Sequence, residues 1–231
     1  MVRTFISMAG GVLVAVPLVL LAAQLPVEQP RAGPLPTATG TIEGVVEVPT
    51  RPARRVEQRY PTRTPDGPRE QRPVPSVAHL EGPVEAPAAG DVSLEIIQRD
   101  SIFQPSLVVV PVGGTVAFPN DDPFFHNVFS YSRAARFDLG RYPEGESKDV
   151  TLTEPGYVKV FCEIHDWMRA AVLVVENPFY ARVEEDGRFT LTGVPAGTHT
   201  LRVTHFDEGS RAVEVEVPPG GTIEVQVDLG G

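Results

Sequence analysis

The amino-acid sequence predicts an all-β protein, and three observations favour this class. The apolar runs are short and rich in valine, which suits brief strands better than helices. Proline (24 residues) and glycine (21 residues) interrupt these runs throughout the chain. With 231 residues and 42% hydrophobic content, the chain is long enough for one large or two small domains, each with its own core.

Residues 1–25 have the pattern of a secretory signal peptide. Arg3 precedes an apolar run from Phe5 to Ala23, and a cleavage point is expected after Ala23. The run is close to the roughly 20 residues needed to span a bilayer, so an uncleaved membrane-anchor helix is the alternative. In both cases we expect the rest of the chain to be periplasmic or otherwise outside the cytoplasm.

Residues 26–39 are rich in proline and small residues and are expected to be a linker. A first strand is predicted at "GTIEGVVEVP", from Gly40 to Pro49. It is followed by an Arg- and Pro-rich loop from Thr50 to Pro75, which is too polar to order itself. We interpret this loop as solvated, with a basic docking arm as the alternative. Residues 40–89 are therefore expected to contain this strand and the polar loop that follows it.

Residues 90–176 are predicted to form a compact domain of short strands. The strand signals are "VSLEII", "LVVVPVG", "GTVAFPN", "KDVTLT", "GYVKVF" and "AAVLVV". Their spacing of roughly ten residues, with Gly and Pro between them, is typical of a Greek-key β-sandwich. Residues 177–231 contain a second set of alternating runs, in which Asp186-Gly187 predicts a two-residue hairpin.

Charge is unevenly distributed along the chain. Residues 1–72 carry a net charge of +3 and residues 73–231 a net charge of −13. An acidic folded body argues against nucleic acid as a partner. It is compatible with docking to a basic protein, and equally with a surface that is acidic only for solubility.

The single cysteine, Cys162, lies in the segment "VFCEIHDWM". Cys162, His165 and Met168 form the motif Cys-x-x-His-x-x-Met between two predicted strands, and His126 follows an earlier strand. One thiolate, two imidazoles and one thioether are the ligands of a trigonal copper site with a weak axial Met. The pattern thus predicts a mononuclear copper site.

These residues also allow other interpretations. A lone Cys in an exported chain can form an intermolecular disulfide, be an inert buried thiol or act as a nucleophile. The nucleophile is disfavoured because no third group is evident to orient the base. Zinc accepts Cys and His, but its fourth ligand is more often Cys, His or a carboxylate than a thioether. Met168 as core filler is the remaining alternative. The three other histidines, His79, His199 and His205, are interpreted as ordinary surface or core residues.

"PGYVKVFCEIHDWM", with "FPNDDPFFHNV" upstream, resembles the cupredoxins, and among them the plastocyanin and amicyanin group. The resemblance implies type 1 copper bound by His126, Cys162, His165 and Met168. It further implies that Asn127 braces the ligand loop, with Asn120 in a similar supporting place. His165 would then be the electron port, within an apolar patch formed by Pro123, Phe124, Phe125 and Trp167.

"GTIEGVVEVP", "SVAHLEGPV" and "EDGRFTLTGVPAGTHTLRVTHFD" resemble carboxypeptidase regulatory-like domains, which are transthyretin-like β-sandwiches. If both resemblances hold, the cupredoxin domain is inserted in this second sandwich or followed by it.

These resemblances imply a one-electron carrier between exported redox partners, such as a c-type cytochrome or a dehydrogenase. The alternative is a copper-binding carrier without an electron-transfer partner. We do not expect an enzyme, because copper oxidases and nitrite reductases need further histidines, often as His-x-His pairs. This chain has five histidines and no such pair, and the single Cys cannot form a binuclear centre that needs two.

Overall fold

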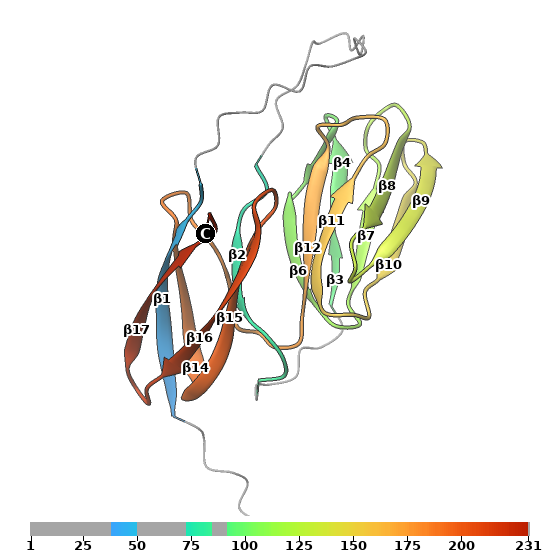
Figure 1. Cartoon of the computed structure of the whole chain (residues 1–231). Coiled ribbons are helices and arrows are strands. Elements are labelled where there is room, and N and C mark those ends of the chain that lie inside the picture. The colour runs from blue at the N-terminus through green and yellow to red at the C-terminus, as the bar shows by residue number, and fades with distance from the viewer. Residues whose placement is uncertain (1–37, 50–72, 85–91, 231) are drawn as a thin grey trace, which may run out of the picture. The chain divides into compact units, whose positions relative to one another are not determined.

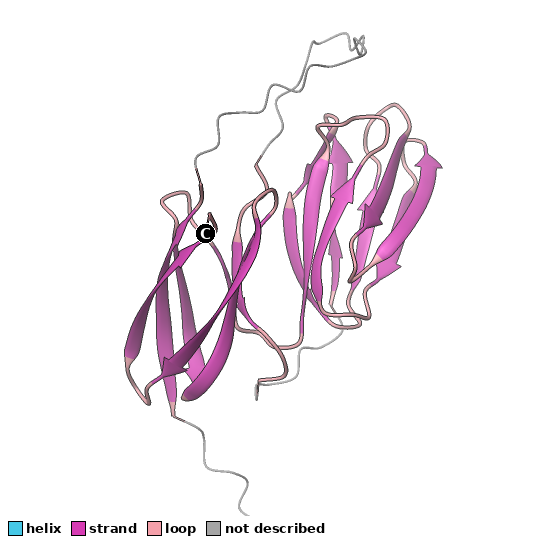
Figure 2. Cartoon of the chain, viewed as in Figure 1, coloured by secondary structure: helices cyan, strands magenta, loops and turns pink. Residues whose placement is uncertain are grey.

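The computed structural model describes residues 38–49, 73–84 and 92–230, and all regular elements within them are β-strands (Figure 2). The predicted all-β class is confirmed for this part of the chain. The expected signal or anchor at 1–25, nearly all of the linker at 26–39 and most of the Arg/Pro-rich loop lie outside the described residues. Within the described ranges, there is no helix long and apolar enough to cross a membrane.

The largest sheet contains five strands in the order β6-β12-β11-β8-β9 (Figure 1). Only β6 and β12 pair in parallel, and the remaining neighbours are antiparallel. The strands are β6 (Leu107–Pro111), β12 (Arg169–Val175), β11 (Gly156–Phe161), β8 (His126–Tyr131) and β9 (Arg136–Tyr142).

A three-stranded sheet and a small hairpin share a core with this five-stranded sheet. The three-stranded sheet has the order β10-β7-β3, and the hairpin pairs β4 with β5. A cluster of buried side chains from both sheets and the hairpin, among them Ile96, Phe118, Val158 and Val172, fills the core. The strands are β10 (Ser147–Thr151), β7 (Thr115–Pro119), β3 (Ser93–Glu95), β4 (Ile97–Arg99) and β5 (Ile102–Gln104).

Each of the six strand signals between residues 90 and 176 coincides with at least one strand, but β5, β8 and β9 were not predicted. For β8 and β9 the reason is the amino-acid composition of the two segments. The β8 segment "HNVFSY" and the β9 segment "RFDLGRY" lack a valine-rich run, and β9 is largely exposed on alternate residues. Strands of this kind are specified by their neighbours rather than by their own apolar content.

Two further sheets are formed by segments from both sides of residues 92–175. One has the order β14-β1-β17, in which β1 pairs antiparallel with β14 and parallel with β17. The other has the order β13-β2-β15-β16. The strands are β1 (Thr39–Glu47), β2 (Val77–Leu80), β13 (Tyr180–Arg182), β14 (Arg188–Pro195), β15 (Gly197–His205), β16 (Gly209–Val217) and β17 (Thr222–Asp228).

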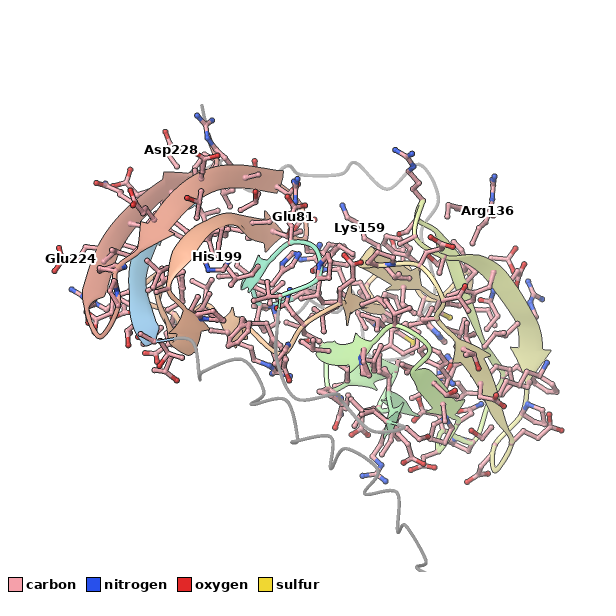
Figure 3. All side chains as sticks on the ribbon, turned by 90° about the horizontal axis from the view of Figure 1, so that it is seen from below. Glu81, Arg136, Lys159, His199, Glu224 and Asp228 are labelled. Carbon is pink, nitrogen blue, oxygen red and sulfur yellow. The ribbon has the colours of Figure 1, made fainter. Side chains whose placement is uncertain are left out.

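Strand alternation gives these two sheets a common core. In β17 the side chains of Glu224 and Asp228 are exposed and point away from the sheets (Figure 3), whereas Val227 is buried. Apolar residues of β1, β14, β15 and β16, including Ile42, Leu191 and Leu201, join Val227 in one buried cluster. This core contains none of the predicted copper ligands.

The predicted hairpin at Asp186-Gly187 is wrong, because the strands on either side of it, β13 and β14, do not pair with each other. A turn does form there, since the Gly187 N–H donates to the Glu184 carbonyl and the Glu184 N–H donates to the Arg188 carbonyl. However, β13 before the turn pairs with β2, and β14 after it pairs with β1. The local sequence specifies a tight reversal, while the sheet that each strand joins is decided by strands far away in the chain.

Candidate metal centre

Pairing of β8 with β11 brings the candidate ligands together. His126 is the first residue of β8, and Cys162 directly follows β11, whose last residue, Phe161, pairs with Phe129. Because the two strands are antiparallel, the beginning of β8 lies beside the end of β11. His165 lies in the ligand loop, which we define as residues 162–168 between β11 and β12.

The Cys162 sulfur and the two histidine rings converge on a single point. The Cys162 Sγ atom lies 3.8 Å from His126 Nδ1 and 3.9 Å from His165 Nδ1, and the two Nδ1 atoms are 3.1 Å apart. The circle through these three atoms has a radius of about 2.1 Å, within the metal–nitrogen and metal–sulfur bond lengths of about 2.0–2.3 Å. The donor atoms therefore fit one metal ion without rearrangement. Among the described residues, this is the one His/Cys/Asp/Glu group of such compactness.

The two histidines differ in exposure. His126 is fully buried, whereas His165 is half-buried. Burial lowers the pKa of His126, against the opposing effect of Asp122, so its ring is neutral and suited to ligation. One candidate ligand is therefore closed to solvent, and the other is partly accessible.

Met168 closes the ligand loop. Its backbone N–H donates to the His165 carbonyl at 3.0 Å, and its side chain is 1% exposed, in the same cluster as Cys162 and Trp167. This burial agrees both with an axial ligand and with a packing role, so the thioether ligand stays a prediction.

Asn127 and Asn120 are buried, and each makes hydrogen bonds to backbone near the site. The Asn127 Oδ1 atom accepts from the Glu163 N–H at 2.6 Å, directly beside Cys162. The Asn120 Nδ2 atom donates to the carbonyls of Phe124 and Tyr142. These hydrogen bonds tie Asn127 to the ligand loop and Asn120 to the segment that carries His126, and the bracing role of the two residues stays a prediction.

Asp122 is a site residue that was missed in the sequence. Its Oδ2 atom lies 2.7 Å from His126 Nε2, on the side of the ring opposite Cys162, and the two side chains are 6% and 0% exposed. Burial works to raise the pKa of Asp122, but the hydrogen bonds from His126, Ser101 and Asp100 outweigh it and hold this pKa below its usual value. The only signal in the sequence is the four-residue spacing between Asp122 and His126.

The surface beside His165 is apolar, but it differs from the predicted patch. Phe124 and Phe125 are 42% and 54% exposed, and the Phe124 ring lies 5.8 Å from that of His165. Trp167, in contrast, is 6% exposed and is wrongly placed in the predicted patch. Its Nε1–H donates to the Ser101 carbonyl at 2.9 Å, which turns the indole inward against His165. Ile164, which is 38% exposed, was not predicted.

Comparison with known proteins gives similarity to solved structures only. No protein-family model and no curated protein sequence matches the chain. The chain is similar to a novel purple cupredoxin from Nitrosopumilus maritimus (26% identity, 35% of this chain, 98% of that chain, TM-score 0.32). It is also similar to a reduced point mutant of amicyanin (24% identity, 42% of this chain, 97% of that chain, TM-score 0.34). A third similar structure is the copper-containing nitrite reductase from Thermus scotoductus SA-01 (26% identity, TM-score 0.36), where the alignment covers 41% of this chain and 25% of the reductase.

Proposed function

We propose that this protein is an exported mononuclear type 1 copper protein that carries single electrons between redox partners. The observation that carries the proposal is the convergence of Cys162 Sγ, His126 Nδ1 and His165 Nδ1 at distances that suit one metal ion. Copper bound there would supply a one-electron couple.

The donor set favours copper over zinc. A thiolate with two imidazoles suits both Cu(I) and Cu(II), and buried Met168 in the same loop is a suitable axial donor. The compact group that the described residues form supplies three donors, and zinc would more often take its fourth ligand from Cys, His or a carboxylate than from a thioether. The buried frame of Asn120 and Asn127 would keep the ligands in place when an electron moves.

The apolar surface of Phe124, Phe125 and Ile164 beside His165 supports a docking role for this end of the domain. Apolar exposed patches are typical of interaction sites. The net charge of −13 on residues 73–231 favours a basic redox partner, such as a c-type cytochrome or a dehydrogenase. We propose that electrons enter and leave through His165.

The proposed organisation is a cupredoxin domain at residues 90–176, inserted in a transthyretin-like sandwich that residues 40–89 and 177–231 supply. Pairing of β1 with β14 and β17, and of β2 with β13 and β15, supports it. Export, with cleavage or retention of residues 1–25, is proposed from the sequence alone.

Copper loading of the purified protein tests the proposal. An intense Cu(II)–thiolate band in the visible spectrum and a narrow hyperfine splitting in EPR are expected. Cys162→Ser should abolish the band. His199→Gln is the control and should retain the band, because the His199 side chain is hydrogen-bonded to the Pro195 carbonyl. A band that persists in Cys162→Ser would contradict the ligand assignment.

Copper carriage is the second candidate function. The partial exposure of His165 would also allow handover of the metal to another protein. A colourless protein that binds only Cu(I) would favour carriage, whereas a stable blue Cu(II) form that is reversibly reduced would favour electron transfer.

A further inference from the structure

The carboxylate of Asp122 lies on the far side of His126 from Cys162 and His165. We propose that Asp122 is a positioning residue of the metal centre, which fixes the His126 ring and makes the site favour Cu(II) over Cu(I). This inference rests on the proposed copper function.

The hydrogen bond to Asp122 defines which ring nitrogen of His126 carries the proton. A carboxylate oxygen only accepts hydrogen bonds, so His126 Nε2, at 2.7 Å from Asp122 Oδ2, must be the protonated nitrogen. The neutral ring then has its lone pair on Nδ1, the atom that faces Cys162 and His165. The contact thus prepares the ring for a metal before any metal is bound.

The carboxylate itself is held rigidly by the turn between β4 and β5. The Asp100 N–H donates to Asp122 Oδ1 at 2.7 Å, and the Ser101 N–H donates to Oδ2 at 2.8 Å. Both turn residues have positive φ angles, 57° and 55°, which residues other than glycine adopt rarely. A strained two-residue turn whose consecutive N–H groups both bind one buried carboxylate indicates a local structure built around that carboxylate.

The same turn reaches the second histidine. The Ser101 carbonyl accepts the Trp167 Nε1–H at 2.9 Å, and the Trp167 ring packs against His165 with a centroid separation of 5.0 Å. The Asp122 N–H in turn donates to Asn120 Oδ1 at 3.0 Å. Asp122 is therefore hydrogen-bonded both to His126 and to the turn whose Ser101 carbonyl positions Trp167 against His165.

The negative charge has a defined effect on the metal. A carboxylate that accepts the distal N–H of a ligating imidazole makes the imidazole a stronger electron donor. A stronger donor stabilises the more highly charged Cu(II) ion more than Cu(I). Loss of the charge should therefore raise the reduction potential.

Asp122→Asn removes the charge with little change in shape. With its amide oxygen in the place of Oδ2, asparagine still accepts from His126 and Ser101, and only the bond from Asp100 is lost. We expect the preference for Cu(II) over Cu(I) to fall about tenfold, which corresponds to a potential about 59 mV higher for one electron. Asp122→Ala, which removes the acceptor altogether, should raise the potential further.

Asp121→Asn is the matched control. It removes the same charge one residue away, but Asp121 is 39% exposed and pairs with Arg99 at 2.6 Å rather than with His126. Because water and salt screen an exposed charge, we expect its effect on the Cu(II)/Cu(I) preference to be less than about twofold. Equal shifts in Asp121→Asn and Asp122→Asn would overturn the proposal.

Nitrogen-15 NMR of the histidine rings in the copper-free protein gives a readout that does not depend on copper. Wild-type His126 should be a single tautomer with the proton on Nε2, and Asp122→Ala should lose this preference. A proton on Nδ1 in the wild-type protein would overturn the inference even if the variants did not fold. A wild-type protein that never turns blue would instead refute the copper function, because the tautomer is measured independently.

Discussion

His79 lies within β2 and is 8% exposed, and its Nδ1 atom has no hydrogen-bond partner among the described residues. Burial lowers the pKa of His79 from 6.5 to about 4, while Glu81 opposes this effect and Arg202 reinforces it. The folded protein therefore keeps His79 neutral at a pH where the unfolded chain would protonate it. Below pH 6.5 the unfolded state binds more protons, so the free energy of unfolding falls as the pH falls towards 4.

The difference between the pKa of His79 in the unfolded chain and in the folded protein sets the size of this loss of stability. At about 1.36 kcal/mol for each pKa unit, the loss of stability between about pH 7.5 and pH 4 is about 3 kcal/mol. Urea unfolding of the copper-free protein across this range would measure it. His79→Leu, which fills a similar volume without titrating, is the comparison, because every other titrating group contributes equally to both proteins.

The free energies of unfolding of wild type and His79→Leu are expected to diverge as the pH is lowered. The variant should lose about 3 kcal/mol less than the wild type between about pH 7.5 and pH 4. Parallel pH profiles for the two proteins would refute the reasoning, because they would mean that His79 titrates normally in the folded state.

Other substitutions test the packing and the ligand loop. A Cβ atom at Gly44 would lie 2.2 Å from the buried Phe189 ring, so Gly44→Ala should lower the free energy of unfolding by about 1–3 kcal/mol, measured by urea titration. Leu201→Ala should lower it by about 2–5 kcal/mol without changing the visible spectrum, since this core excludes the ligands. Asn127→Ala leaves the Glu163 N–H without its acceptor and should weaken copper binding about tenfold in a chelator competition; Asn127→Asp, which keeps an acceptor, should weaken it less.

The sequence alone predicted the strands that contain an alternating or valine-rich run of apolar residues. The alternating and valine-rich runs at β1, β7, β11 and β12 coincide with predicted strands. In contrast, β9 is half exposed and interrupted by charges, so its pairing with β8 determines it. For the same reason the turn at Asp186-Gly187 was predictable, but the sheets on either side of it were not.

The same distinction holds for the candidate site: residues that lie close together in the sequence could be predicted, and contacts that the fold creates could not. Cys162, His165 and Met168 are visible together because they share one loop, and His126 has a recognisable place 36 residues earlier. Asp122 was missed because its role depends on the backbone of Asp100 and Ser101, which only the fold brings to it. The inward position of Trp167 likewise follows from a hydrogen bond across 66 residues of sequence.

The position of β1 between β14 and β17 has a consequence for how the chain is made. A ribosome completes β1 long before β17, its parallel neighbour, which ends at Asp228. Strands β3 to β12 can meanwhile pair with one another, because all their partners lie within residues 93–175. Distant pairings form slowly, and an unpaired strand edge attracts other chains. The edge of β1 that β17 covers thus stays unpaired until β17 is added, and a truncation that removes β17 would make this exposure permanent.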